Sequence, residues 1–225
     1  MAVRALIREI RRKRQAPDFK NGVFLHGEQE TGNTMDTLIG MAIGIGLSAA
    51  CGFRVFVPLL IMNLATSSGQ IHLSPEFSWI GSPYATAAFA TATLIEILCY
   101  YIPWVDHIID TISTPAAVIA GTVVTASTAI ELSPFLKWTL ALIAGGGIAG
   151  LVQGSTVALR AKSSISTGGA ANPLISTLEL IGAILTALLA VLVPVLCLIL
   201  VGFFCFVIFR KVGRLIFGRM KFQQR

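Results

Sequence analysis

The chain is poor in charged residues. Only 12% of its 225 residues are Asp, Glu, Lys or Arg, whereas soluble domains carry about 25%. This deficit, together with 55% hydrophobic residues and a mean hydropathy of +0.79, excludes an ordinary soluble domain and indicates a membrane protein. Several segments reach the length of about 20 apolar residues that a transmembrane helix needs.

The sequence also lacks the residue sets that carry enzymatic chemistry or hold a cofactor. Its four cysteines lie in apolar runs without metal-site spacing, which favours a role as small buried hydrophobes. The triplet Gly145–Gly147 is not a nucleotide-binding loop, because no Lys-Ser/Thr pair follows it. Close helix packing is the better interpretation of these glycines. We therefore expect no enzyme, no metal and no cofactor.

Acidic residues are absent from residues 210–225, which hold six Lys or Arg. Residues 1–35 hold seven Lys or Arg against four acids. Lys and Arg accumulate on the cytoplasmic side of membranes, so we expect a basic cytoplasmic N-terminal extension at 1–35, a transmembrane domain at 36–209 and a basic cytoplasmic tail at 210–225. The expected location is a bacterial inner membrane. Anionic lipid headgroups are the expected partners of the basic ends.

The basic terminal segments allow two other interpretations, neither of which the sequence favours. Nucleic acid is not an expected partner, because no aromatic residues interleave with the basic ones. No cleavable signal peptide is expected, because no apolar stretch follows the basic residues 1–14. The run Met35-Asp36-Thr37-Leu38 resembles a native start, which leaves open whether residues 1–34 belong to the native protein.

Apolar segments that alternate with short links predict an all-α polytopic membrane fold. The expected spans are at about 37–64, 84–102, 114–131 and 137–159, with a cytoplasmic link at 160–172 that carries Arg160 and Lys162. Residues 173–209 are too many for one span, and Pro194 predicts two short helices that turn near Leu189–Pro194. The total is about six transmembrane helices, because two cytoplasmic termini require an even number. A five-span arrangement is the alternative.

A weak internal repeat relates two halves of the chain. Thr37-Leu38 aligns with Thr139-Leu140 at an offset of 102, and Gly44 then meets Gly146. Two halves of three helices each would form inverted three-helix repeats, as in many secondary transporters. Chance similarity is the alternative, because Gly is common in membrane helices.

Three lone charges in apolar runs are the strongest indication of function: Arg54, Glu96 and Glu179. An unpaired ionised side chain in hydrocarbon costs about 3 kcal/mol on insertion scales, so each must face a partner, a water-filled cavity or a ligand. Gly52 and Pro58 flank Arg54 and predict a bend in the first span near it.

Two interpretations of these charges stay open. In the first, Arg54 grips a phosphate or carboxylate with both ends of its guanidinium, while Glu96 and Glu179 take up and release protons. In the second, Arg54 pairs with Glu96 or Glu179 and locks the helices together. Gly52 and Pro58 belong to the same candidate substrate-binding set.

Asp106 and Asp110 lie four residues apart, next to His107. On a helix the two acids would share a face. A metal site is weakly indicated by two acids and one histidine. A solvated interfacial face, or a cap before the third span, is the favoured interpretation.

The stretch Gly52-Phe53-Arg54-Val55-Phe56-Val57-Pro58 resembles the Gly-Leu-Arg-Ala-Phe-Leu-Pro pattern of a bacterial membrane family catalogued as domain of unknown function 4126. That family then shows a membrane Glu, here Glu96, and an Asp-Lys-x-Pro-x-x-Asp-x-x-x-Asp stretch, here residues 100–110. The Asp-Lys pair is replaced by Tyr100-Tyr101. The resemblance covers about residues 35–205 and implies a shared architecture, with no settled activity.

The function expected from these residues is a small secondary transporter or lipid-type translocator for an anionic substrate, coupled to protons. Arg54 would bind the anionic group. The alternative is a non-catalytic membrane scaffold or accessory subunit, in which glycine-rich faces bind partner membrane helices or a second copy of the chain.

Overall fold

The computed structural model describes residues 22–102, 105–130 and 132–222. It divides into two compact units, Met1–Asp36 and Thr37–Arg225, and the account that follows concerns the second. Within the described ranges this unit consists of helices and contains no strand. The predicted basic extension falls mostly outside the described residues.

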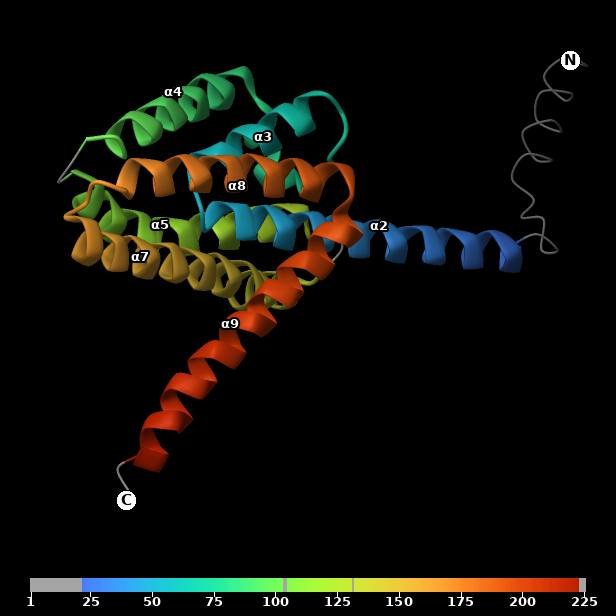
Figure 1. The fold of residues 1–225 in the computed structure, drawn as a ribbon. Coiled ribbons are helices and arrows are strands. Elements are labelled where there is room, and N and C mark those ends of the chain that lie inside the picture. Colours follow the sequence, from blue (N-terminus) through green and yellow to red (C-terminus); the bar gives the residue numbers. More distant parts are fainter. Residues whose placement is uncertain (1–21, 103–104, 131, 223–225) are drawn as a thin grey trace, which may run out of the picture. The chain divides into compact units, whose positions relative to one another are not determined.

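The helices are given in chain order with the labels of Figure 1: α2 (Gly22–Cys51), α3 (Phe56–Ser67), the short 3-10 helix η1 (Pro75–Gly81), α4 (Pro83–Cys99), α5 (Val105–Thr128), α6 (Pro134–Leu140), the π-helical turn η2 (Ala141–Gly146), α7 (Gly147–Thr167), α8 (Asn172–Leu192) and α9 (Pro194–Phe222). Helices α3, α4, α5, α7 and α8 run side by side (Figure 1), and they contact one another in the pairs α3–α4, α3–α8, α4–α5, α5–α7 and α7–α8.

The predicted first span, 37–64, is two short helices that run in opposite directions. α2 ends at Cys51 and α3 begins at Phe56. Gly40 in α2 and Ser74, which follows α3, both contact the last residues of α5. A Cβ on Gly40 would touch the carbonyl of Thr128, and the N–H of Ser74 donates to the carbonyl of Ser127 at 2.8 Å. The prediction of one bent span was therefore wrong, although the break was placed correctly.

Gly52 permits the chain to turn where it does. A Cβ at this position would lie 2.6 Å from the carbonyl oxygen of Ala149 in α7, which is closer than real Cβ contacts come. Only a residue without a side chain lets the turn 52–55 rest on α7. This turn, the link after α4 and the link between α7 and α8 form one end of the bundle, which we call the turn end.

Small residues let α2, α5 and the η2–α7 segment approach closely. A Cβ on Gly145 would lie 2.5 Å from the carbonyl oxygen of Gly121. The Ser48 hydroxyl donates to that same carbonyl of Gly121 at 2.7 Å and lies 2.8 Å from the Thr125 hydroxyl. Close packing, as predicted for the glycine triplet, is confirmed at Gly145, whereas a Cβ on Gly147 would meet nothing within 4 Å.

Two helix boundaries differ between sequence and structure. The helix predicted at 114–131 begins at Val105, so Pro115 lies inside it instead of in its first turn. The predicted break in residues 173–209 is confirmed: α8 ends at Leu192 and α9 begins at Pro194. Because Pro194 has no N–H to donate, it suits the first position of a new helix.

By length and composition, four helices in the described part of the chain are able to cross a membrane: Ile108–Thr128, Pro134–Thr167, Asn172–Leu192 and Pro194–Lys211. A fifth arises if η1 and α4, which meet at 62°, count as one broken span. The protein is therefore an all-helical, multi-pass membrane protein. The count of six and the inverted repeat stay predictions.

Candidate functional site

Glu96 caps the helix that follows the turn. Its carboxylate accepts the N–H of Val55 at 2.8 Å and the N–H of Phe56 at 3.1 Å. These are donors at the start of α3 that have no partner inside the helix. Pro58 adds no further unpaired donor because it lacks an N–H. Glu96 therefore binds backbone, and the interpretation in which it pairs with Arg54 is not supported, since no ion pair between the two is found within the described ranges.

Arg54 projects from the turn toward α8. Its side chain is 2% exposed. Nη2 donates to the carbonyl of Ser176 at 3.0 Å and also to the Ser176 hydroxyl, and it lies 3.9 Å from Oε2 of Glu179. Nε and Nη1 have no hydrogen-bond partner in the described part of the chain. Buried donors of a charged group seldom stay unsatisfied, because the desolvation cost is high.

Arg160 of α7 holds two buried acids, and one of them, Glu179, also lies near Arg54. Its Nε donates to Oε1 of Glu179 at 3.2 Å, and its Nη2 contacts Oε2 of the same carboxylate. Its Nη1 donates to Oδ1 of Asp110 at 2.5 Å. All three residues are buried, and a two-pronged Arg–carboxylate contact is the strongest form of such a pair.

Tyr100 completes the cluster from the end of α4. The guanidinium carbon of Arg54 lies 3.7 Å from its ring centroid, and that of Arg160 lies 4.2 Å from it. Its hydroxyl donates to the hydroxyl of Ser113 at 3.1 Å. One aromatic ring thus contacts both cations, which cation–π attraction favours. We call Arg54, Glu96, Tyr100, Asp110, Arg160 and Glu179 the charge cluster.

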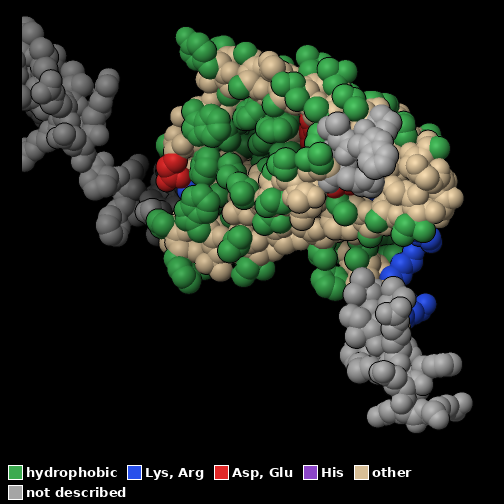
Figure 2. Space-filling view, turned by 90° about the vertical axis from the view of Figure 1, so that its left-hand side faces the viewer, with side chains coloured by type: hydrophobic (Ala, Val, Ile, Leu, Met, Phe, Trp, Pro, Cys, Tyr) green, Lys and Arg blue, Asp and Glu red, His purple; other side chains and the backbone are tan. Residues whose placement is uncertain are grey.

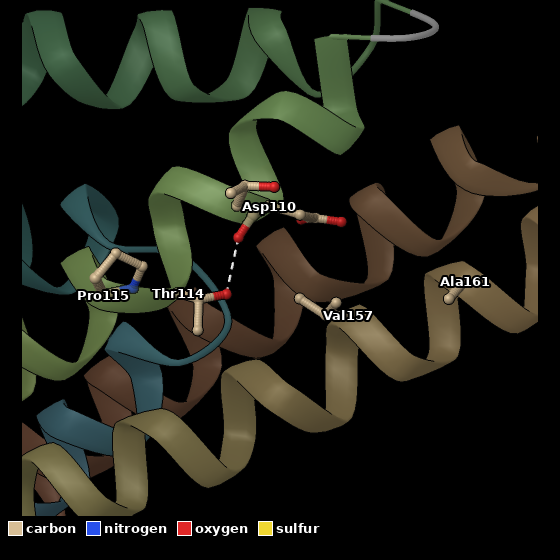
Figure 3. Close-up of a pocket in the computed structure, with 6 residues that line it drawn as sticks. Asp110, Thr114, Pro115, Val157 and Ala161 are labelled. Carbon is tan, nitrogen blue, oxygen red and sulfur yellow. Dashed lines mark hydrogen bonds between the residues drawn. The ribbon is translucent and has the colours of Figure 1, made fainter.

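The members of the charge cluster are buried, at 2–7% exposure. Figure 2 looks onto the turn end and shows hydrophobic side chains with small patches of acidic side chain beside the uncertain residues. A cavity of about 440 Å³ lies beside the cluster, between α5 and α7 (Figure 3). It is lined by Asp110, Thr111, Thr114, Pro115, Val157 and Ala161. Asp110 therefore belongs both to the cavity wall and to the cluster.

The structure brings some of the predicted site residues together and does not describe the side chains of others. Arg54, Glu96 and Glu179 are brought together, with Gly52 and Pro58 next to them in the chain. Asp110 was expected on a solvated interfacial face or as a cap before the third span, and the solvated placement was wrong: the residue is 5% exposed and bound to Arg160. The side chains of Asp106 and His107 lie outside the described residues.

Two members of the cluster were missed by the sequence analysis. Arg160 was assigned to a cytoplasmic link, yet α7 continues to Thr167 and buries it. A usable signal was present, because Gln153, Thr156 and Arg160 recur at helical spacing and share the buried face of α7. Tyr100 was noted only as a departure from the family pattern, and nothing in the sequence indicated its two cation contacts.

A family model described as a domain of unknown function (DUF4126) matches residues 41–214. The chain belongs to this family. The DUF4126 match contains the whole charge cluster and the cavity, so both lie in the part of the chain that the family shares, and it confirms the resemblance carried by the Gly52–Pro58 stretch. No curated protein and no solved structure matches the chain.

In this DUF4126 protein the geometry allows one kind of chemistry in particular. Two guanidinium groups are buried, one with each nitrogen bonded to a carboxylate and one with two nitrogens that have no partner in the described part of the chain. A guanidinium offers donors in a planar fork that matches phosphate and carboxylate, so the unmet donors suit an oxyanion chemically.

Proposed function

We propose that the protein is a small secondary transporter or lipid-type translocator, and that Arg54 binds the anionic group of its substrate. The observation that carries this proposal is the pair of unpartnered nitrogens, Nε and Nη1, on a buried guanidinium. The N–H of Nε and the hydrogens of Nη1 point to different sides of the guanidinium, so an oxyanion that binds at either side would satisfy a donor that the protein leaves unmet.

The broken α2–α3 hairpin supports this role. Non-helical backbone at membrane depth is tolerated where protein buries it or where it lines a cavity, and transporters place their substrate sites at such breaks. Arg54 lies in that break, between Cys51 and Phe56. The acid that caps α3, Glu96, keeps the turn in place.

The pairing of Arg160 with Glu179 provides a way to open and close the site. Arg160 binds Glu179, and Glu179 also lies near Arg54. When Glu179 takes up a proton it loses its attraction for both cations, which would release α7 from α8 at this end. Proton coupling, as predicted, would act through this carboxyl group.

A membrane scaffold is the second candidate. It is favoured by the direct ion pairs that Arg160 makes with Asp110 and Glu179, since a buried ionic network also fixes how helices pack. This role predicts no flux above that of empty liposomes for any compound, together with a lower unfolding temperature for variants of the network.

The test is uptake or lipid scrambling in proteoliposomes with a panel of phosphate- and carboxylate-bearing compounds. Arg54→Ala should abolish the flux that the wild-type protein shows, and Lys137→Ala should keep it. Lys137 is a matched control, because it pairs with the exposed Glu76 away from the charge cluster. If Arg54→Ala leaves every detected flux unchanged, the proposed role of Arg54 is wrong.

We also propose that both termini face the cytoplasm of a bacterial cell, as the basic ends favour. Either four or six crossings satisfy this orientation, whereas five would place the termini on opposite sides. A Leu215→Cys variant labelled with a membrane-impermeant maleimide in right-side-out and inside-out vesicles decides between them. Labelling in inside-out vesicles alone is expected.

A further inference from the structure

With its arginines and carboxylic acids ionised, the charge cluster carries one more negative than positive charge. Its two cations, Arg54 and Arg160, stand against three acids, Asp110, Glu179 and Glu96. A bare anion that entered would raise the excess of negative charge in a buried site, where uncompensated charge is costly. A substrate group that brings its own positive charge avoids this cost.

Asp110 is the member of the cluster that such a group can reach. Its Oδ1 binds Nη1 of Arg160 at 2.5 Å, and the same residue lines the cavity between α5 and α7 (Figure 3). The volume of about 440 Å³ falls in the range of small-ligand sites. Contact with Asp110 is therefore possible without unfolding the cluster.

The cavity lies on a face that belongs to the bilayer. The two helices that line it carry large apolar side chains that are more than half exposed, Ile108 and Ile112 on α5 and Leu159 on α7. Asp110 is five residues from the start of α5, which places it about 7.5 Å along the helix. A position this close to one end of a membrane-crossing helix is within reach of a lipid headgroup.

We propose, on the basis of the proposed function, that the ligand is a zwitterion with a primary ammonium and a phosphate group, namely the phosphoethanolamine headgroup of a membrane lipid. It enters through the α5–α7 cavity and separates Asp110 from Arg160. The ammonium binds Asp110, and the phosphate replaces Asp110 on Arg160, next to Arg54. One ion pair within the protein is replaced by two ion pairs between the protein and the ligand, and the net charge of the site does not change.

The lining of the cavity distinguishes a primary from a quaternary ammonium. A primary ammonium has N–H donors for carboxylate and hydroxyl oxygens, which Asp110 and Thr114 present. A quaternary ammonium is bound by aromatic cages, and among the residues that the structure describes no aromatic side chain lines this cavity. The site should therefore prefer phosphoethanolamine to phosphocholine.

The experiment measures the unfolding temperature of the full chain in detergent against the concentration of short-chain phosphatidylethanolamine. Phosphatidylcholine and phosphatidylglycerol with the same acyl chains are the comparisons, and free phosphoethanolamine is a separate arm. We expect phosphatidylethanolamine to act at concentrations roughly ten- to hundredfold lower than the other two lipids, as loss of a charged hydrogen bond implies.

Three variants locate the effect. Asp110→Asn should lose the preference for phosphatidylethanolamine over phosphatidylglycerol, and Val157→Phe, which fills the cavity, should lose it as well. Lys137→Ala should keep it. If Asp110→Asn does not fold, Val157→Phe decides, because it leaves every charge in place.

Equal or tighter action of phosphatidylglycerol on the wild-type protein overturns the proposal, and so does a preference that survives Val157→Phe. If free phosphoethanolamine acts as well as the lipid, the headgroup chemistry stands and the lipid source is wrong. An anion flux that needs Arg54 but shows no preference for phosphatidylethanolamine would refute this inference alone. A clear preference for phosphatidylethanolamine without any flux that depends on Arg54 would refute the proposed function, but the phosphoethanolamine site in the α5–α7 cavity would stand.

Discussion

Arg160 of α7 holds both carboxylate oxygens of Glu179 of α8, and its remaining terminal nitrogen holds Asp110 of α5. One guanidinium thus joins three helices in the interior of the bundle. Because it pairs with two buried acids, its loss removes a direct ionic contact from each of them.

Arg160→Met should lower the free energy of unfolding by about 3–5 kcal/mol, since removing one partner leaves buried charge uncompensated. Denaturant titration of the protein in mild detergent measures this. The comparison change, Lys137→Met, should cost less, because only one member of that pair is buried: its partner Glu76 is 67% exposed and stays solvated when Lys137 is lost. Equal costs for the two variants would mean that Arg160 does not hold the cluster together.

Glu96→Ala should cost about 0.5–2 kcal/mol, the usual effect of losing a helix cap. The backbone N–H groups of Val55 and Phe56 should then exchange with deuterium faster, because their acceptor is gone. The N–H of Ala85, which the hydroxyl of Ser82 caps at the start of α4, is the internal control and should not change. Uniform exchange at all three positions would contradict the capping role.

The sequence was sufficient for those features that depend on local chemistry. Pro194 broke the long apolar run where the structure breaks it, and Gly52 marked the turn beside Arg54. Lone charges in apolar runs indicated buried groups, since hydrocarbon does not tolerate them unpaired.

Features that depend on distant contacts were out of reach. Residues 37–64 have the length of one span, so their length did not reveal that the chain reverses at Gly52. The partner of Arg54 was undecided between Glu96 and Glu179, because distances across helices are not encoded in spacing along the chain. Arg160 was misplaced because Lys162 and several serines follow it and resemble a solvated link.

Gly145 and Gly147, which lie two residues apart, provide a test of the helix packing. Gly145→Ala should destabilise the protein by about 1–3 kcal/mol through overpacking, because its Cβ would press on the carbonyl of Gly121 and the hydroxyl of Thr125. Gly147→Ala should be neutral or stabilising, since its Cβ would meet nothing within 4 Å and Ala favours helix over Gly. Unfolding midpoints that fall equally would show that η2 does not contact α5 closely.

Tyr100 offers a graded test of the cation contacts. Tyr100→Phe keeps the ring and loses only the hydrogen bond to Ser113, at a cost of about 0.5–1.5 kcal/mol. Tyr100→Leu also loses the ring beneath Arg54 and Arg160, which should add about 1–4 kcal/mol for the two contacts. Unfolding free energies of the two variants are to be compared directly, and a Leu variant as stable as the Phe variant would show that the ring contacts contribute nothing.

Nitrogen NMR of arginine side chains in lipid nanodiscs tests most directly whether the Arg54 guanidinium is buried and whether its Nε–H can donate to a ligand. The account predicts that the Nε–H of Arg54 exchanges with water far more slowly than that of Arg210, which is exposed on α9, and that its resonance shifts when phosphatidylethanolamine is added. Exchange as fast as that of Arg210, with no response to the lipid, would contradict it.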